Sequence, residues 1–152
     1  GYGLLDIQAV INELSPLEGA VDFLNWLRER FQVVILSDTF YEFAMPFMKQ
    51  LGYPTLLCHK LEVDDKGKVV DYALRQANTK RQAVICFHSM YYRTIAAGDS
   101  YNDISMLAAA SVGILFRPPE KLSAEFPQYP QVHSYVDLKK EFIKASHRNL
   151  IL

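Results

Sequence analysis

The sequence predicts an α/β fold built on an open, mostly parallel sheet. Short apolar segments that end in polar residues alternate with amphipathic segments of helical spacing, which is typical of strands and helices that alternate around such a sheet. Residues 94–98 show the pattern best, because this apolar run stops at Gly98 and two aspartates follow within five residues. A length of 152 residues fits one domain with a substantial core.

The first half of the chain contains signals for two helices, a strand and a hairpin. Ser15 can cap a helix, since a proline follows it and Glu18 completes a capping box. Gly52 is a natural C-terminal cap, and residues 64–67 form a turn between two stretches that alternate apolar and polar residues. The expected elements are a helix from Pro16 to about Arg30, a strand over 32–36, a helix over 40–51 and an antiparallel hairpin over 55–74.

The second half repeats the alternation of strand and helix. Prolines at 118–119, 127 and 130 indicate loops. The expected elements are a helix that begins near Thr79, strands over 94–98 and 112–116 with a helix over 105–110 between them, and a last amphipathic helix over 137–146.

Composition excludes several classes of function. Half of the residues are hydrophobic and the net charge is −1, with the basic residues scattered, so we expect no nucleic-acid partner. No apolar run is long enough to span a membrane and no signal peptide is visible, so we expect a cytoplasmic protein without a membrane partner. Cys58 and Cys86 lack the spacing of a metal or redox motif, and we expect free, buried thiols. Oligomeric state is left open.

Asp99 and Asp103 lie four positions apart, where a strand is expected to give way to a helix. Two carboxylates on one turn suit Mg²⁺, which prefers one or two carboxylates together with waters and phosphate oxygens. In the alternative interpretation, Asp99 caps the next helix and Asp103 is solvated in its first turn. This segment alone favours neither interpretation.

Three polar signals share one position, at or beyond the carboxyl end of a strand. A hydroxyl and a lysine ammonium can hold phosphoryl oxygens, while paired carboxylates hold a metal, so together they suit phosphate chemistry. Singly, a serine there is more often a helix cap and a lysine more often a solvated surface group. The three signals are Ser37-Asp38, Lys80, and the group Asp99, Asn102 and Asp103.

The order of these signals resembles the haloacid dehalogenase superfamily of phosphotransferases. Val34-Ile35-Leu36-Ser37-Asp38 looks like its second motif, Lys80 like its third, and Gly98-Asp99-Ser100-Tyr101-Asn102-Asp103 like its fourth. The Asn-Asp ending of the fourth motif and the hairpin after the second are typical of the phosphoserine phosphatase branch. The similarity is greatest to the bacterial bifunctional phosphoserine phosphatases/homoserine phosphotransferases, and it extends over nearly the whole chain.

This resemblance implies a three-layer α/β/α core over residues 15–152, with residues 1–14 as the remnant of a helical cap. It implies an Mg²⁺-dependent phosphatase acting on a small phosphorylated amino acid, phosphoserine, with possible phosphoryl transfer to homoserine. The roles that it implies are metal ligand for Asp99, catalytic roles for Lys80 and Asp103, phosphoryl binding for Ser37 and Lys80, and substrate binding for the backbone of Asp38 and for Asn102.

The family's first motif, with its nucleophilic aspartate, is missing before Ser37. Asp6 and Asp22 follow no apolar strand and lack the neighbours of that motif. We therefore expect a fragment, whose first strand and most of whose cap lie upstream. An inactive domain that keeps only metal or phosphate binding is the alternative function.

Two other classes fit less well. A phospho-acceptor receiver domain has its acidic cluster first and its lysine last, the reverse of the order here. A dinucleotide-binding domain needs a Gly-x-Gly-x-x-Gly turn, which is absent.

Overall fold

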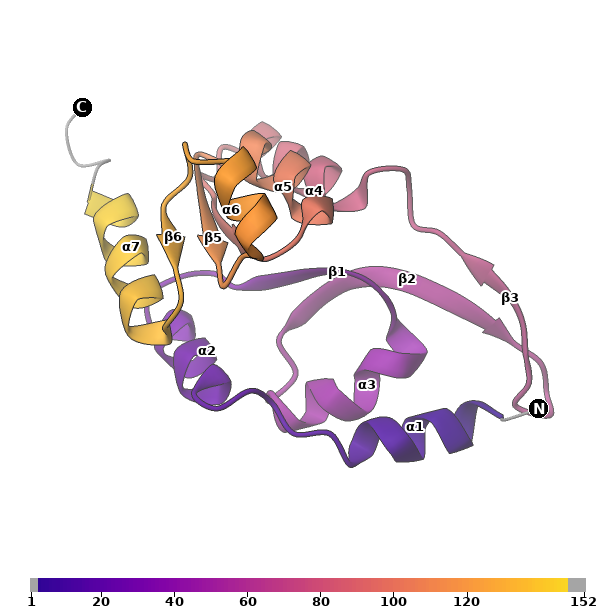
Figure 1. The fold of residues 1–152 in the computed structure, drawn as a ribbon. Helices are drawn as coiled ribbons and strands as arrows, with labels where there is room; N and C mark the ends of the chain where they lie inside the picture. Colours follow the sequence, from indigo (N-terminus) through magenta and orange to yellow (C-terminus); the bar gives the residue numbers. More distant parts are fainter. Residues whose placement is uncertain (1–2, 148–152) are drawn as a thin grey trace. The chain divides into compact units, whose positions relative to one another are not determined.

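A computed structural model of the chain describes residues 3–147. The chain forms two compact units that divide between Thr79 and Lys80. Figure 1 shows the elements of each unit in sequence colours. Both units combine helices with strands, and among the described residues the strand pairings are parallel apart from β2 with β3, which confirms the predicted α/β class.

The first unit is built on a sheet with the strand order β1-β2-β3. Strands β1 and β2 are parallel, whereas β2 and β3 form the predicted antiparallel hairpin. In the hairpin turn, the Asp64 carboxylate accepts hydrogen bonds from the backbone N–H groups of Lys66 and Lys68, both at 2.9 Å. The elements are α1 (Leu4–Asn12), α2 (Ala20–Arg28), β1 (Val34–Phe40), α3 (Tyr41–Gln50), β2 (Thr55–Val63) and β3 (Val69–Ala73).

Apolar side chains from α2, α3 and β2 form the core of the first unit. Burial of such side chains stabilises a fold by about 1.5–3 kcal/mol each. Helix α1 is joined to α3 by a hydrogen bond from the Gln8 side chain to the Glu42 carbonyl, 2.7 Å long. The buried core residues are Leu24, Ala44, Met48, Leu51, Leu56 and Cys58.

Two boundaries in the first unit differ from expectation. Helix α2 begins at Ala20 rather than Pro16, because Gly19 takes a left-handed conformation with φ of 81° that ends any helix before it. Strand β1 continues to Phe40 rather than stopping at Leu36, since Phe40 pairs with His59 of β2 beyond an irregularity in the register.

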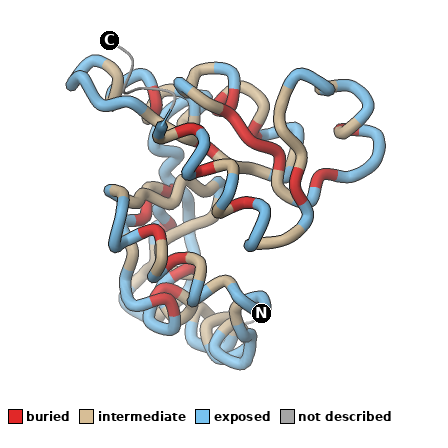
Figure 2. Tube along the Cα trace, turned by 90° about the vertical axis from the view of Figure 1, so that its left-hand side faces the viewer, coloured by how far each residue is buried: buried red, intermediate tan, exposed pale blue. Residues whose placement is uncertain are grey.

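The second unit contains the parallel sheet β4-β5-β6. Its most deeply buried side chains, Ile114 and Leu115 of β5 among them, are fully enclosed, and Figure 2 marks the buried stretches of the chain in red. The elements are α4 (Thr79–Ser89), which starts at the boundary, β4 (Ile95–Gly98), the 3₁₀ helix η1 (Tyr101–Asp103), α5 (Ile104–Ala109), β5 (Val112–Phe116), α6 (Glu120–Glu125), β6 (Gln131–Val132) and α7 (Tyr135–His147).

Helix α6 and strand β6 lie where proline predicted only loops. Pro119 caps the start of α6, a position that tolerates proline because the first N–H groups of a helix have no partner within it. Strand β6 has two residues and follows Pro130, whose carbonyl accepts a hydrogen bond from the Leu115 N–H at 2.8 Å. Periodicity gives no signal for so short a strand.

Two further sequence expectations are settled within the described residues. Both cysteines are free, as expected, but only Cys58 is buried. The expectation of burial is wrong for Cys86, because this residue faces outward on α4. Over residues 3–147, no helix is both long and apolar enough to cross a membrane.

Candidate active site

The carboxyl end of β4 carries a cluster of hydrogen-bonded polar residues. The strand ends at Gly98, and Asp99 and Ser100 lead into η1, whose last residue is Asp103. Ligands of open α/β sheets bind at the carboxyl ends of the strands. Strand, turn and helix therefore place this acidic pair where a substrate would bind.

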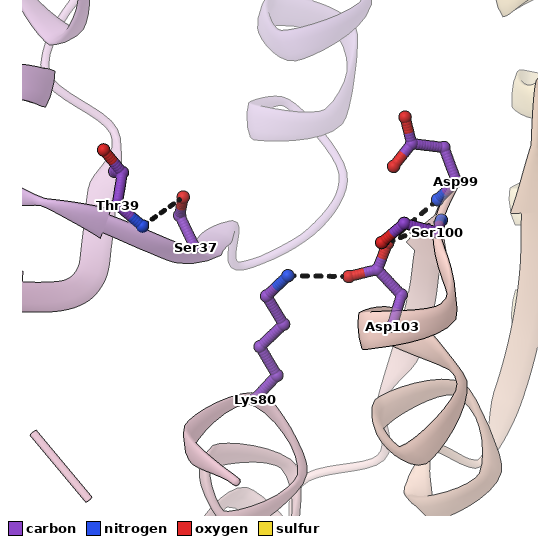
Figure 3. Close-up of polar contacts among 6 residues, drawn as sticks. All are labelled: Ser37, Thr39, Lys80, Asp99, Ser100 and Asp103. Carbon is purple, nitrogen blue, oxygen red and sulfur yellow. Dashed lines mark hydrogen bonds and ion pairs between the residues drawn. The ribbon is translucent and has the colours of Figure 1, made fainter. Parts of the chain in front are cut away.

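Asp103 is buried, with 6% of its surface exposed, and forms an ion pair with Lys80. The Lys80 ammonium lies 2.8 Å from Asp103 Oδ1, and both side chains are largely shielded from solvent, 13% and 8% exposed. The two side chains point toward each other from α4 and from the start of α5 (Figure 3). Asp103 is therefore not solvated, which excludes the alternative interpretation of this residue as a surface group.

The second oxygen of Asp103 accepts hydrogen bonds from the turn that precedes it. Its Oδ2 lies 3.0 Å from the Asp99 N–H nitrogen, 3.1 Å from the Ser100 nitrogen and 3.0 Å from the Ser100 hydroxyl (Figure 3). With Lys80 on Oδ1, both carboxylate oxygens have partners. Asp103 thus connects α4 to the turn after β4.

The protonation of Asp103 is set by these contacts. Burial works to raise the pKa of this carboxyl, but the hydrogen bond and charge of Lys80 and the backbone N–H groups of Ser100 and Asp99 outweigh it. The net effect places the pKa below its ordinary value. Asp103 is therefore ionised at neutral pH.

Asp99 differs from Asp103 in being exposed. Among the residues drawn in Figure 3, its carboxylate forms no hydrogen bond and points away from Asp103. In residues 3–147 no three acidic, histidine or cysteine side chains cluster as a metal cage. One exposed carboxylate at a strand end nevertheless fits Mg²⁺, which takes few protein ligands and keeps waters and phosphate oxygens.

The neighbours of these residues are solvent-exposed. Asn102 is exposed on η1, beside the buried Asp103. Arg81 is also exposed, whereas the side chain of the adjacent Lys80 is largely buried against Asp103. The geometry therefore favours Lys80 over Arg81 as the cation of the site.

Ser37 and Asp38 belong to the first unit, where both lie on β1. The Ser37 hydroxyl oxygen accepts a hydrogen bond from the Thr39 N–H at 3.2 Å (Figure 3), and Asp38 is exposed. The expected role of Ser37 and Asp38 in substrate binding remains a prediction. The residues that the structure brings together are Lys80, Asp99 and Asp103 of the second unit.

Sequence reasoning missed Ser100. The signal was present, because Ser100 and Asp103 are three positions apart, the spacing of a capping box, in which an acidic side chain reaches back to the N–H of the cap residue. The metal-binding pattern of Asp99 and Asp103 does not include the serine between them.

Comparisons with known proteins identify the family of the chain. The family model of the haloacid dehalogenase-like hydrolases matches residues 3–111. A curated relative, phosphoserine phosphatase ThrH of Pseudomonas aeruginosa, is 67% identical over 152 residues, which make up the whole chain and 74% of that protein. A phosphoserine phosphatase of Pseudomonas syringae pv. tomato is 64% identical over the whole chain and 64% of its own length, so the chain spans less than two thirds of this relative.

Solved structures support the fold. A crystal structure of an apo phosphoserine phosphatase matches with a TM-score of 0.71 and 24% identity, over 86% of this chain and 67% of that one. A substrate-bound phosphoserine phosphatase complex matches with a TM-score of 0.72 and 22% identity, over 88% and 66%. These likenesses confirm the expected fold class.

The chain belongs to the haloacid dehalogenase-like hydrolases, a family of enzymes. Its sequence is 67% and 64% identical to two phosphoserine phosphatases, the branch that the motifs predicted.

Proposed function

We propose that this chain forms most of a cytoplasmic, Mg²⁺-dependent phosphoserine phosphatase. The observation that carries the proposal is the buried Lys80–Asp103 ion pair beside the exposed carboxylate of Asp99. Two relatives named as phosphoserine phosphatases, 67% and 64% identical, support the choice of substrate. The proposed substrate is thus a small phosphorylated amino acid.

Each residue of the site has a defined role in the proposed reaction. Lys80 donates hydrogen bonds to the phosphoryl oxygens, and its ammonium offsets the charge that grows on them in the transition state. Asp103 holds Lys80 in place through Oδ1. Asp99 would hold Mg²⁺, which when bound supplies positive charge beside the transferred phosphoryl group. The family resemblance implies that Ser37, the backbone N–H of Asp38, and Asn102 contribute further substrate contacts.

None of the residues assigned above is the nucleophile of the proposed reaction. Family resemblance implies a first-motif aspartate that forms an aspartyl-phosphate, later hydrolysed by water. No such motif occurs in residues 1–152. We infer that catalysis needs a longer chain in which a segment with the first motif precedes residue 1, called here the extended chain.

The test is phosphate release from phosphoserine by the extended chain, with and without Mg²⁺. Turnover that requires Mg²⁺ and prefers phosphoserine over phosphothreonine and sugar phosphates would support the proposal. Absence of turnover with phosphoserine, under conditions where the Pseudomonas aeruginosa relative is active, would refute it. Addition of homoserine as phosphoryl acceptor tests the transfer reaction that the resemblance implies.

A further inference from the structure

The Ser100 hydroxyl is the side-chain donor among the three hydrogen-bond donors on Asp103 Oδ2. Its Oγ lies 3.0 Å from Oδ2, and the backbone nitrogen of the same residue lies 3.1 Å from that oxygen. Ser100 thus donates two hydrogen bonds to one carboxylate oxygen of Asp103. Hydrogen bonds to a charged acceptor are about twice as strong as those between neutral groups.

The backbone does not require serine at this position. Ser100 has φ of −131° and ψ of 166°, an extended conformation that any residue adopts. The 3₁₀ turn is closed by a separate bond, from the Asp103 N–H to the Ser100 carbonyl at 3.0 Å. The Ser100 hydroxyl bonds the Asp103 carboxylate in addition to its place in the capping box with the Asp103 N–H.

Asp103 has two different partners on its two oxygens, so its side-chain rotation sets the direction of the lysine contact. With Oδ2 held by Ser100 and by the Asp99 N–H, Oδ1 faces Lys80 Nζ at 2.8 Å. A carboxylate held only by backbone donors would have more freedom to rotate. Lysine is a flexible point charge whose useful position depends on such partners.

We propose that Ser100 is a positioning residue for phosphoryl transfer, which acts through Asp103 to fix the Lys80 ammonium. This inference rests on the proposed function for its kinetic consequence, whereas the fixing of Lys80 does not depend on the substrate. Ser100 itself touches neither substrate nor metal in this role. Its contribution appears in the transition state, where an ammonium displaced from the growing charge loses most of its effect.

The variants for the test are Ser100→Ala and Ser100→Thr in the extended chain. Ser100→Ala should lower kcat by about five- to tenfold, since it removes one of several hydrogen bonds to a charged group, and should change KM less than twofold. Ser100→Thr keeps the hydroxyl in an extended backbone and should restore kcat to within about twofold of the parent.

Ser111→Ala is the matched control. The Ser111 hydroxyl also accepts a backbone N–H bond, from Thr94 at 3.2 Å, but Ser111 precedes β5 and lies at the opposite end of the strand from the site. The thermal unfolding temperature of Ser111→Ala should change by an amount similar to that of Ser100→Ala, while the kcat of Ser111→Ala stays unchanged. A loss of kcat equal in both alanine variants, or no rescue by threonine, would overturn the proposal.

A second measurement separates this inference from the proposed function. The rate at which an amine-acylating reagent modifies Lys80, followed by peptide mass spectrometry, needs no substrate. Ser100→Ala should raise this rate at least threefold and Ser111→Ala should leave it unchanged. If the parent extended chain fails to hydrolyse phosphoserine, the proposed function falls, and this rate alone decides the role of Ser100: an unchanged rate refutes it.

Discussion

Gly98 lies so close to Asp103 that no side chain fits between them. A Cβ built on Gly98 would stand 2.5 Å from the Asp103 Cβ and 2.7 Å from its Oδ2. Glycine is therefore required here by the space that Asp103 occupies. This close approach allows the Asp103 carboxylate, at the start of α5, to contact the end of β4.

The substitution Gly98→Ala should displace Asp103 and separate it from Lys80. We expect a loss of about 1–3 kcal/mol in the free energy of unfolding, as for overpacking elsewhere, together with a loss of most phosphatase activity in the extended chain. Gly113→Ala is a matched control, because its Cβ would meet the Leu107 carbonyl at 2.8 Å, away from the acidic pair. It should destabilise the protein to a similar degree but spare kcat of the folded fraction. Equal kcat loss in both variants would contradict the prediction.

Asp99→Asn tests the proposed metal ligand. A neutral amide cannot balance a divalent cation, so the extended chain should need at least about tenfold more Mg²⁺ for half-maximal activity. Titration of activity with Mg²⁺ measures this shift, and Glu120→Gln, which neutralises another exposed acid of the second unit, is the control. An unchanged Mg²⁺ requirement would remove Asp99 from the site.

Lys80→Ala and Arg81→Ala compare two adjacent cations. The Lys80 side chain is largely buried against Asp103, whereas Arg81 is exposed. Loss of Lys80 should lower kcat/KM for phosphoserine by about a hundredfold or more, since a positioned charge next to the phosphoryl group is removed. Arg81→Ala should change it less than threefold. The opposite ranking would place the third motif one residue later.

The sequence predicted which polar residues of the second unit lie together better than it predicted element boundaries. The strand–turn–helix geometry accounts for the spacing of Asp99 and Asp103, and Lys80 of α4 lies 2.8 Å from Asp103 Oδ1, whereas the roles of these residues stay predictions. Helix α2 was placed four residues too early, because the capping signal at Ser15 is local and the left-handed Gly19 overrides it. Sequence periodicity cannot show such a backbone conformation.

Contacts between distant residues explain what else was missed. The pairing of β6 with β5 depends on hydrogen bonds to a neighbouring strand, and nothing in two residues reports it. Exposure of Cys86 depends on which face of α4 is covered, since its neighbour Val84 is buried on the same helix. The spacing of Ser100 and Asp103 is that of a capping box, but spacing alone does not show that Lys80 bonds the other oxygen of Asp103.

The two cysteines should differ in reactivity. Burial and, to a smaller extent, the charge of Glu42 raise the pKa of the Cys58 thiol to about 11, against a partial offset from Arg75. Because the thiolate is the reactive form, a thiol reagent at neutral pH should label the exposed Cys86 rapidly and Cys58 only on unfolding. Labelling of single-cysteine variants, Cys58→Ala and Cys86→Ala, measures the two rates. Similar rates in the native protein would contradict the burial of Cys58.

The same shift predicts a pH effect on stability. A group with a raised pKa in the folded state contributes stability that is complete below its unfolded pKa and is lost as pH rises through the folded value. For Cys58 this window runs from about 9 to about 11. In denaturant titrations, the parent should lose more stability across this window than Cys58→Ala does.

The last prediction concerns residues 1–152 on their own. The Asp103 carboxylate is hydrogen-bonded to Lys80 and to the turn, and Asp99 is the proposed ligand of the cation. Neither carboxylate therefore remains to accept a phosphoryl group. We expect no phosphoserine hydrolysis by these residues alone at any Mg²⁺ concentration, because loss of a covalent nucleophile removes the step that divides the reaction. Phosphate release by the purified 152-residue chain and by the extended chain, measured side by side, provides the check. Steady turnover by the shorter chain would reveal an unrecognised nucleophile, and the exposed Asp38 would be the first residue to replace.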